Sequence, residues 1–331
     1  MLKETIGIAI AAGIAAIVIP DLLGGRSGDI RPKVVAEPRA KPAAQHHGYL
    51  DQRVGNSPYG MNETVHRVPV TIPLIRGSHN GWMIVTAYKP DGPGPFPAII
   101  HHHGTDPDKR ASPRRYRQFR YARYWVSRGF AVFAVTRLGF GDAGLEPFPE
   151  RIYGGCRNPN FQLIYDSLAA QSEAALRYVR SLQYVRYNQI VLSGQSRGGT
   201  TVIAHLANKA DGVIGGINFA GSYAYGQKPS RPDGCRFDRM KKLLSQHGRR
   251  ARAPSLWVFG SDDKLHPLEN VYKRVEAYNR GGGDAELFVI PKQRDLNGHY
   301  VISRPRLWEK KVDAFVESLD IRLGVVGIAA R

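Results

Sequence analysis

The chain has 331 residues, which is enough to bury one large hydrophobic core or two medium ones. Hydrophobic residues make up 42% of it and charged residues 23%, proportions that exclude a wholly disordered protein. Lysine and arginine together number 47 against 28 acidic residues, and the resulting formal charge of +19 favours contact with an acidic substrate, an anionic membrane surface or nucleic acid.

The N-terminal segment predicts an export signal. One lysine precedes an apolar run over residues 6–20, and this run is shorter than the roughly 20 residues of a membrane span. It fits the hydrophobic region of a signal peptide, so we expect residues 1–25 to direct export to the periplasm or out of the cell. Glu4 weakens the basic start, and no clear small-residue cleavage motif follows. The main alternative is therefore an uncleaved membrane anchor through residues 5–20, and a buried helix is the third.

Strand-like and helix-like segments alternate from Met61 onward, after residues 26–60, whose Gly, Pro, Arg and Ala content predicts a linker. Two loosely alternating strands come first. The apolar runs FPAIIHH, FAVFAV, QIVLSG, VIGGINF, SLWVFG and AELFVI follow, and such runs are typical of buried parallel strands. This order predicts an α/β fold over residues 61–320, with a mostly parallel eight-stranded sheet and helices on both faces, followed by a C-terminal tail at 321–331.

Arginine is concentrated in two stretches. The longer, DKRASPRRYRQFRYAR at residues 108–123, interleaves arginines with aromatic residues, a composition that suits stacking on nucleic-acid bases. A solvated helix or loop face is the simpler interpretation, so we expect no nucleic-acid partner. Steering of an anionic substrate is the functional alternative. The shorter stretch, HGRRARA, covers residues 247–253.

The chain has two cysteines, Cys156 and Cys235. Neither has a Cys or His partner at the spacing of a zinc site, so no structural metal is expected. Both lie in loop sequences rich in Gly, Pro and Arg, where they would form a disulfide in an exported protein and stay reduced in the cytosol. We expect the disulfide, and we expect residues 222–250, which interrupt the sheet after its sixth strand, to form a lid or pocket wall.

Ser196 stands at the centre of the sequence GQSRG, where a strand-like run meets a helix-like one. In a sharp strand-to-helix turn the central residue is strained, and side chains two positions before and after it would collide. This steric restriction explains why glycine stands at both positions, Gly194 and Gly198. The N–H groups at the start of the following helix favour a developing negative charge. Ser196 is predicted to be a nucleophile rather than a turn residue.

A nucleophilic serine needs a base and a group that orients the base. Asp262 and Asp263 follow the seventh strand, and His299 lies between the last strand and the last helix. The carboxyl ends of parallel strands meet at one edge of a sheet, so we expect a triad in the chain order serine, aspartate, histidine. The backbone N–H groups of Thr105 and Arg197 are the predicted donors to the oxyanion.

Three consecutive histidines, His101, His102 and His103, stand at the end of the third strand. Side chains alternate between the two faces of a strand, so the three cannot converge on one ion. No carboxylate stands at ligand spacing. We therefore predict no metal site.

Over residues 61–320 the chain resembles the α/β-hydrolase family. The matching motifs are HHHGT, RLGFGDAG, GQSRGG, GSDDKLHP and the histidine of GHY. Within the family the chain looks most like the dienelactone hydrolases and acetyl xylan esterases, whose acid lies three residues after a glycine and four before a proline. Gly260 and Pro267 match that frame, so the resemblance selects Asp263. Dienelactone hydrolases proper carry cysteine as the nucleophile; Ser196 stands there in this chain and points to ordinary ester hydrolysis.

The resemblance implies a serine carboxylesterase that cleaves a small or medium ester through an acyl-enzyme and needs no cofactor. Its substrate would be a small-molecule ester, and the arginines would favour an anionic one. A serine peptidase or an acyltransferase would use the same three residues. An alternative from a different class is a non-catalytic basic protein that binds anionic polymers.

Overall fold

The computed structural model describes residues 52–56, 61–208, 211–222 and 233–324, which belong to one folded unit. The predicted signal or anchor at residues 1–25 lies outside these ranges. None of the helices within them is both long and apolar enough to cross a membrane.

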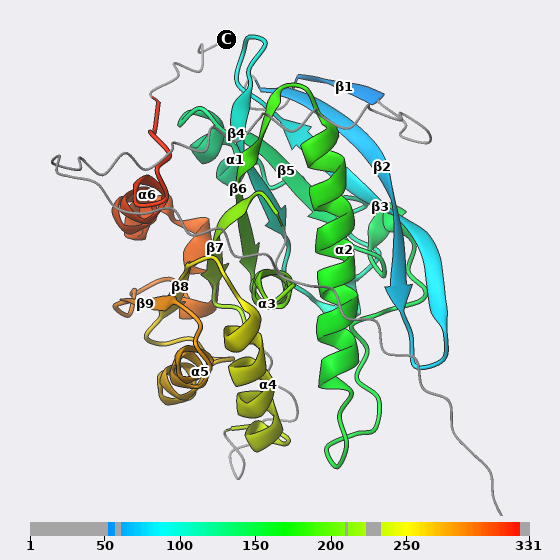
Figure 1. Ribbon diagram of the computed structural model, residues 1–331, viewed down its shortest axis with the longest axis vertical. Coiled ribbons are helices and arrows are strands. Elements are labelled where there is room, and N and C mark those ends of the chain that lie inside the picture. Colours follow the sequence, from blue (N-terminus) through cyan, green and yellow to red (C-terminus); the bar gives the residue numbers. More distant parts are fainter. Residues whose placement is uncertain (1–51, 57–60, 209–210, 223–232, 325–331) are drawn as a thin grey trace, which may run out of the picture. The chain divides into compact units, whose positions relative to one another are not determined.

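A nine-stranded sheet organises the unit, in the order β1-β2-β3-β5-β4-β6-β7-β8-β9 (Figure 1). The strands at one edge are antiparallel: β1 (Gln52–Asn56), β2 (Asn62–Pro73) and β3 (Ser78–Tyr88). The others run parallel to one another: β4 (Phe96–His102), β5 (Ala131–Thr136), β6 (Val185–Gln195), β7 (Val213–Phe219), β8 (Ser255–Gly260) and β9 (Ala285–Ile290). Antiparallel pairing of β3 with β5 joins the two parts.

The expected eight strands are all present, and β1 adds a ninth within the predicted linker. Its sequence, QRVGN, shows no alternation of apolar and polar residues that would mark it as a strand. Its backbone pairs with that of β2, with Gln52 opposite Val65. The segment is therefore a strand because its backbone pairs with β2 at the edge of the sheet. The pattern of residues within one segment does not predict such pairing.

The strand order creates a topological switch between β4 and β6. Strand β4 lies between β5 and β6, and the chain leaves β4 and β6 toward opposite faces of the sheet. Helix α1 (Phe119–Val126) follows β4 on one face, and α3 (Arg197–Leu206) follows β6 on the other. Ligand sites of open α/β sheets lie beyond the carboxyl ends of the strands at such a point. Ser196 follows β6 directly and Thr105 lies just beyond β4, so both stand at this switch.

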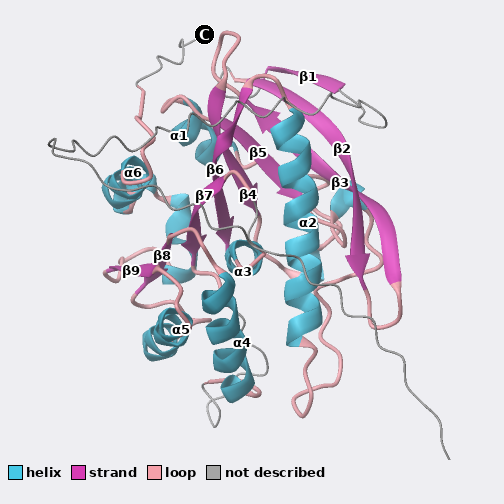
Figure 2. Cartoon of the chain, in the orientation of Figure 1, coloured by secondary structure: helices cyan, strands magenta, loops and turns pink. Residues whose placement is uncertain are grey.

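Helices cover both faces of the sheet, as predicted (Figure 2). One face carries α2 (Phe161–Ser181), α3, α4 (Phe237–Arg250) and α5 (Leu268–Arg280). The other carries α1 and α6 (Glu309–Glu317), with Trp125 and Trp308 buried between them and the sheet. Short 3₁₀ turns complete the connections: η1 (Pro107–Lys109), η2 (Gly141–Ala143), η3 (Gly298–Ser303) and η4 (Pro305–Leu307).

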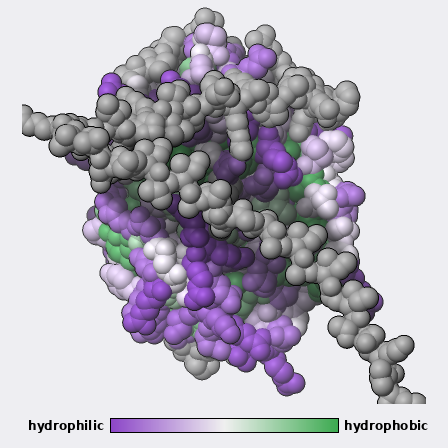
Figure 3. Space-filling model, viewed as in Figure 1, coloured by the Kyte–Doolittle hydropathy of each residue, from purple (hydrophilic) through white to green (hydrophobic). Residues whose placement is uncertain are grey.

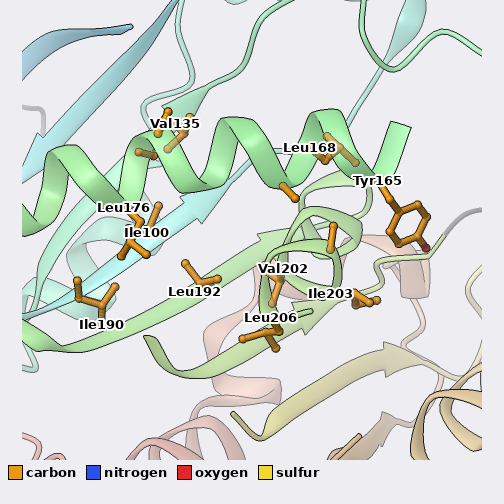
Figure 4. Packing of buried hydrophobic residues seen from close by; sticks show 14 of the residues in the cluster. Ile100, Val135, Tyr165, Leu168, Leu176, Ile190, Leu192, Val202, Ile203 and Leu206 are labelled. Atoms are coloured by element: carbon orange, nitrogen blue, oxygen red, sulfur yellow. The ribbon is translucent and has the colours of Figure 1, made fainter. Parts of the chain in front are cut away.

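The larger core lies under α2 and α3 (Figure 4). Helix α2 repeats apolar residues at three- and four-residue spacing, so Leu168 and Leu176 share its buried face. Ile100 of β4, Leu192 of β6 and Val202 of α3 are fully buried in the same cluster. Each side chain of this size stabilises the fold by about 1.5–3 kcal/mol relative to exposure. This packing holds the ends of β4 and β6 in place.

The segment predicted as a lid, residues 222–250, contains a regular helix of the fold. Helix α4 is the crossover between β7 and β8, and it packs against α5. Met240, Leu243 and Leu244 are buried in the core. Apolar residues at that spacing make α4 a core-facing helix of the fold, and the prediction of a lid or pocket wall at residues 222–250 stays a prediction. Residues 223–232 lie outside the described residues.

Cys156 and Cys235 form a disulfide. It joins the loop before α2 to the segment before α4, and Cys235 is buried. The bridge therefore ties together two connections that both emerge on the helical face carrying α2 and α4.

Candidate active site

Ser196 occupies the turn between β6 and α3 in a strained backbone conformation. Its φ of 53° and ψ of −117° lie in a region that non-glycine residues rarely adopt. A residue held there costs about 1–3 kcal/mol and persists only where its surroundings fix it. Two main-chain hydrogen bonds do so: the Ser196 N–H donates to Phe219 O (2.8 Å), and Ser196 O accepts from Thr200 N–H (3.1 Å).

The glycines on either side of the serine have the predicted steric role. A Cβ added to Gly194 would lie 2.1 Å from the carbonyl carbon of Gly198. A Cβ added to Gly198 would lie 1.9 Å from His102 O, at the end of β4. Both contacts are with backbone atoms, which cannot rotate out of the way as the end of a side chain can. The glycines therefore allow the turn to close on itself and on β4.

Asp263 and His299 are hydrogen-bonded to each other. His299 Nδ1 lies 3.0 Å from Asp263 Oδ2, and the two residues are only 3% and 5% exposed. The other carboxylate oxygen, Asp263 Oδ1, accepts from the N–H groups of Leu265 (2.8 Å) and His266 (3.0 Å). Both oxygens are thus held in fixed directions. With Nδ1 bonded to Asp263, Nε2 is the ring nitrogen left to take a proton.

The neighbouring Asp262 is placed differently. It lines a surface cavity of about 390 Å³ together with Lys264, Lys292 and Asp295. The structure therefore pairs His299 with Asp263, the aspartate that the resemblance selects.

Two glycines bring the acid loop and the histidine loop together. A Cβ on Gly260 would lie 2.3 Å from Gly298 Cα, and a Cβ on Gly298 would lie 2.7 Å from Asp263 N. Asn297 caps the histidine turn, since its Oδ1 accepts from the His299 N–H at 3.1 Å. We did not predict Asn297 or Gly298, although the sequence NGH carries the signal of a capped tight turn.

Gln195 links the serine turn to the histidine loop. Its Nε2 donates to His299 O at 3.2 Å, and it directly precedes Ser196. Its Oε1 lies 2.2 Å from where a Cβ on Gly104 would stand, and Ser196 Cβ lies 3.3 Å from the same point. The end of β4 therefore rests directly against the serine, as an oxyanion strand must.

The predicted oxyanion residues, Thr105 and Arg197, contact one buried carboxylate. The Thr105 hydroxyl donates to Glu150 Oε2, and Arg197 Nε lies 3.4 Å from the same oxygen. Glu150 Oε1 accepts from Arg137 Nε at 2.8 Å. The side chains of Glu150 and Arg137 are fully buried. Neither residue was predicted, because an acid in the loop sequence FPER looks like any exposed loop residue.

His101 and His102, the last two residues of β4, point to opposite faces of the sheet. His101 Nδ1 lies 3.2 Å from Ser193 Oγ, and its ring contacts Tyr121 of α1. His102 Nε2 lies 2.9 Å from Ser172 Oγ of α2, on the opposite face of the sheet. Burial, reinforced by Arg137, lowers the pKa of His101 to about 3, and the pKa of His102 falls well below its ordinary value for the same causes. These rings are neutral parts of the core.

A further histidine, His266, lies beside the candidate base. Its ring centroid is 5.5 Å from that of His299, and Arg274 Nη1 lies 3.4 Å from its Nδ1. Burial first, and then Arg274, holds the pKa of His266 well below its ordinary value. His266 therefore adds no second positive charge next to His299.

Four of the six arginines in the arginine-rich stretch form ion pairs within the fold. Arg115 and Arg117 pair with the buried Glu63. Arg110 pairs with Glu146, and Arg114 pairs with Asp142. On the face shown in Figure 3 hydrophilic residues cover most of the coloured surface, and hydrophobic residues form only small separate areas. The ion pairs favour a structural role for this part of the stretch over a free basic patch.

The strand order, the strained serine turn and the Asp263–His299 hydrogen bond together fit an α/β-hydrolase fold. No family model and no curated protein matches the sequence. Solved structures do share the fold. An acetyl xylan esterase from Paenibacillus sp. R4 superposes with a TM-score of 0.56 at 17% identity, over 82% of this chain and 88% of that one.

Two further hydrolases agree with this likeness. Acetyl xylan esterase 1 from Thermoanaerobacterium sp. JW/SL YS485 has a TM-score of 0.51 at 16% identity, over 79% of this chain and 87% of that one. The dienelactone hydrolase-like promiscuous phosphotriesterase P91 from metagenomic libraries has 0.51 at 14%, over 79% of this chain and 99% of that one. The chain has the α/β-hydrolase fold, as its motifs predicted.

Proposed function

We propose that the protein is a serine carboxylesterase of the dienelactone hydrolase and acetyl xylan esterase type. Ser196 is the nucleophile, His299 the base and Asp263 the group that orients the base. One observation carries the proposal: the buried 3.0 Å contact between His299 and Asp263 forms at the same sheet edge where Ser196 is held in a strained turn. That combination is what a serine nucleophile requires.

In the acylation step, Ser196 Oγ attacks the carbonyl carbon of the ester while His299 Nε2 takes the hydroxyl proton. The carbonyl oxygen becomes an oxyanion facing the N–H groups of Thr105 and Arg197. One such donor contributes about 3–4 kcal/mol to the transition state. His299 then passes its proton to the leaving alkoxide, and the alcohol departs from an acyl-enzyme.

Deacylation repeats the same proton transfers with water in place of the serine. Asp263 stays ionised throughout and stabilises the imidazolium that forms twice per turnover. Each step uses only groups of this chain, so the proposal includes no cofactor.

The proposed substrate is a small-molecule ester with a short or medium acyl group. Two of the structures that share the fold bear the name acetyl xylan esterase, which supports an acetyl ester as the first candidate. Export is part of the proposal as well, because the Cys156–Cys235 bridge is a feature typical of oxidising compartments.

Labelling with a fluorophosphonate probe tests the nucleophile. We expect the wild-type protein to form one covalent adduct on Ser196, and Ser196→Ala to form none. Ser318→Ala is the matched control, because Ser318 caps the C-terminus of α6 and its hydroxyl donates to Phe315 O. A folded wild-type protein that stays unlabelled would overturn the proposal.

A substrate panel then separates the related activities. Nitrophenyl esters of increasing acyl length should be hydrolysed, with the highest kcat/KM at the short end. Peptide anilides should be cleaved much more slowly. Faster cleavage of anilides would favour a peptidase, and product formation only in the presence of an added alcohol would favour an acyltransferase.

A further inference from the structure

Glu150 is a buried acid in the loop between β5 and α2, a position without an obvious role in the fold's regular elements. One of its oxygens, Oε2, accepts from the Thr105 hydroxyl and lies 3.4 Å from Arg197 Nε. The carboxylate therefore touches both residues whose N–H groups serve as oxyanion donors in the proposed mechanism.

The two donors come from different parts of the fold. Thr105 follows β4, and Arg197 begins α3 after β6. The space between their N–H groups depends on how these two elements stand relative to each other. Hydrogen bonds weaken steeply with distance and angle, so a small change in that space alters both interactions with an oxyanion.

The contacts of Glu150 with both residues involve their side chains. Its contacts are with the Thr105 hydroxyl and with the Arg197 guanidinium. A single carboxylate can thus link the two donor residues and hold them at a fixed separation.

Arg137 fixes the carboxylate in turn. Its Nε donates to Glu150 Oε1 at 2.8 Å, its Nη1 to His103 O at 2.6 Å and its Nη2 to Thr105 Oγ1 at 3.1 Å. The Thr105 side chain is therefore held from two sides. Paired, charge-assisted hydrogen bonds of this kind are strong and directional, and they offset the cost of burying the carboxylate.

The geometry points to Glu150 as a positioning residue that sets the width of the oxyanion hole, with Arg137 as its support. The inference rests on the proposed function. Glu150 acts through Thr105 and Arg197 and does not touch the ester. Its removal should affect the transition state, where the oxyanion exists, and leave ground-state binding of the ester nearly unchanged.

The test compares Glu150→Ala and Glu150→Gln with the wild-type protein on a nitrophenyl acetate assay. For Glu150→Ala we expect kcat to fall on the order of tenfold to a hundredfold, below the roughly 10²–10³-fold loss caused by removing one donor outright, while KM changes less than about twofold. Glu150→Gln should recover part of kcat, because the amide oxygen still accepts from Thr105. A trifluoromethyl ketone forms a tetrahedral oxyanion on the serine. Its affinity should fall by about the same factor as kcat.

Glu63→Gln is the matched control. Glu63 is also fully buried and also bridges two arginines, Arg115 and Arg117, but its partners are not oxyanion residues. We expect a comparable loss of Tm and an unchanged kcat per folded molecule. Equal losses of kcat in Glu63→Gln and Glu150→Gln would overturn the inference and leave only a structural role.

A second pair of variants covers the case in which Glu150→Ala does not fold. Thr105→Val keeps the shape and the backbone N–H but removes the hydroxyl that donates to Glu150, and Thr105→Ser keeps the hydroxyl. We expect kcat to fall much further in Thr105→Val than in Thr105→Ser. Equal kcat in the two variants would overturn the inference. The proposed function fails separately, through an absence of fluorophosphonate labelling in the wild-type protein.

Discussion

His299 Nδ1 lies 3.0 Å from Asp263 Oδ2, although the two residues stand 36 positions apart in the chain. The two loops approach each other closely at Gly260 and Gly298, where an added Cβ would meet backbone atoms of the other loop. The carboxylate then has one oxygen for the imidazole and one for two main-chain N–H groups. This division holds the histidine in the tautomer that a general base needs.

Asp263→Asn should lower kcat for ester hydrolysis by about 10⁴-fold, because an amide in this position favours the wrong imidazole tautomer. The fold should survive, since asparagine is of equal size. Steady-state kinetics on a short-chain nitrophenyl ester measures the loss.

Asp262→Asn is the control for that measurement. Asp262 lines a surface cavity with Lys264 and Lys292, and His299 Nδ1 contacts Asp263 instead, so Asp262→Asn should stay within about threefold of the wild-type kcat. A large loss in Asp262→Asn with little loss in Asp263→Asn would reverse the assignment of the acid.

Gly198→Ala should destabilise the protein and abolish activity. The new methyl group would lie 1.9 Å from His102 O, a backbone atom at the end of β4, so β4 and α3 must move apart. Overpacking of this kind costs about 1–3 kcal/mol, and the shift would also displace the serine turn. Thermal unfolding and fluorophosphonate labelling measure the two effects.

Gly324→Ala gives the comparison. The nearest atom to a Cβ on Gly324 is Arg128 O at 4.0 Å, so the substitution meets no obstacle. It should leave Tm and labelling unchanged. If Gly198→Ala also left Tm and labelling unchanged, α3 would not lie as close to the end of β4 as described.

The sequence predicts those parts of the site that local backbone rules govern. The glycines around Ser196 follow from the sterics of one turn, and the expectation of an aspartate and His299 at the same edge follows from the rule that parallel strands end there. The alternation of apolar runs and amphipathic segments likewise predicts the layers of the fold. Each of these inferences needs only neighbouring residues or the order of elements. The choice of Asp263 over Asp262 comes from the family resemblance.

Other features depend on tertiary contacts that leave little trace in the sequence. Strand β1 exists through pairing with β2, and Glu150 is buried because Arg137 reaches it from the end of β5. Both residues of that pair belong to the stretch RLGFGDAGLEPFPER, where nothing distinguishes Glu150 from the exposed Glu146. Helix α4 buries Met240, Leu243 and Leu244 although the sequence around them is rich in charged residues.

Removal of the disulfide should destabilise the protein without removing its activity. The Cys156–Cys235 bridge spans 79 residues, and a loop of that length stabilises the folded state by about 4–5 kcal/mol in the chain-entropy treatment. The double variant Cys156→Ser/Cys235→Ser should show that loss in urea unfolding, and added reductant should lower the stability of the wild-type protein alone. An unchanged urea midpoint would mean that the bridge does not form in solution.

Buried histidines predict that the fold loses stability in acid. Burial, reinforced by Arg250, lowers the pKa of His247 to about 3, and burial alone lowers the pKa of His205 to about 4. Histidines of the unfolded chain titrate near pH 6.5. Between pH 6.5 and the lower folded-state values, the unfolded state therefore binds more protons than the folded one. The free energy of unfolding is therefore highest above about pH 6.5. Below it, each such histidine lowers the free energy of unfolding by roughly 1.4 kcal/mol per pH unit.

His247→Gln tests this on a residue of α4 that lies in the core beside Tyr165. The variant cannot take up the proton, so the difference in its free energy of unfolding between pH 7 and pH 5 should be smaller than that of the wild-type protein by about 2 kcal/mol. Urea unfolding at the two pH values gives both numbers. An identical pH dependence in the variant would show that His247 titrates in the folded state much as it does in the unfolded chain.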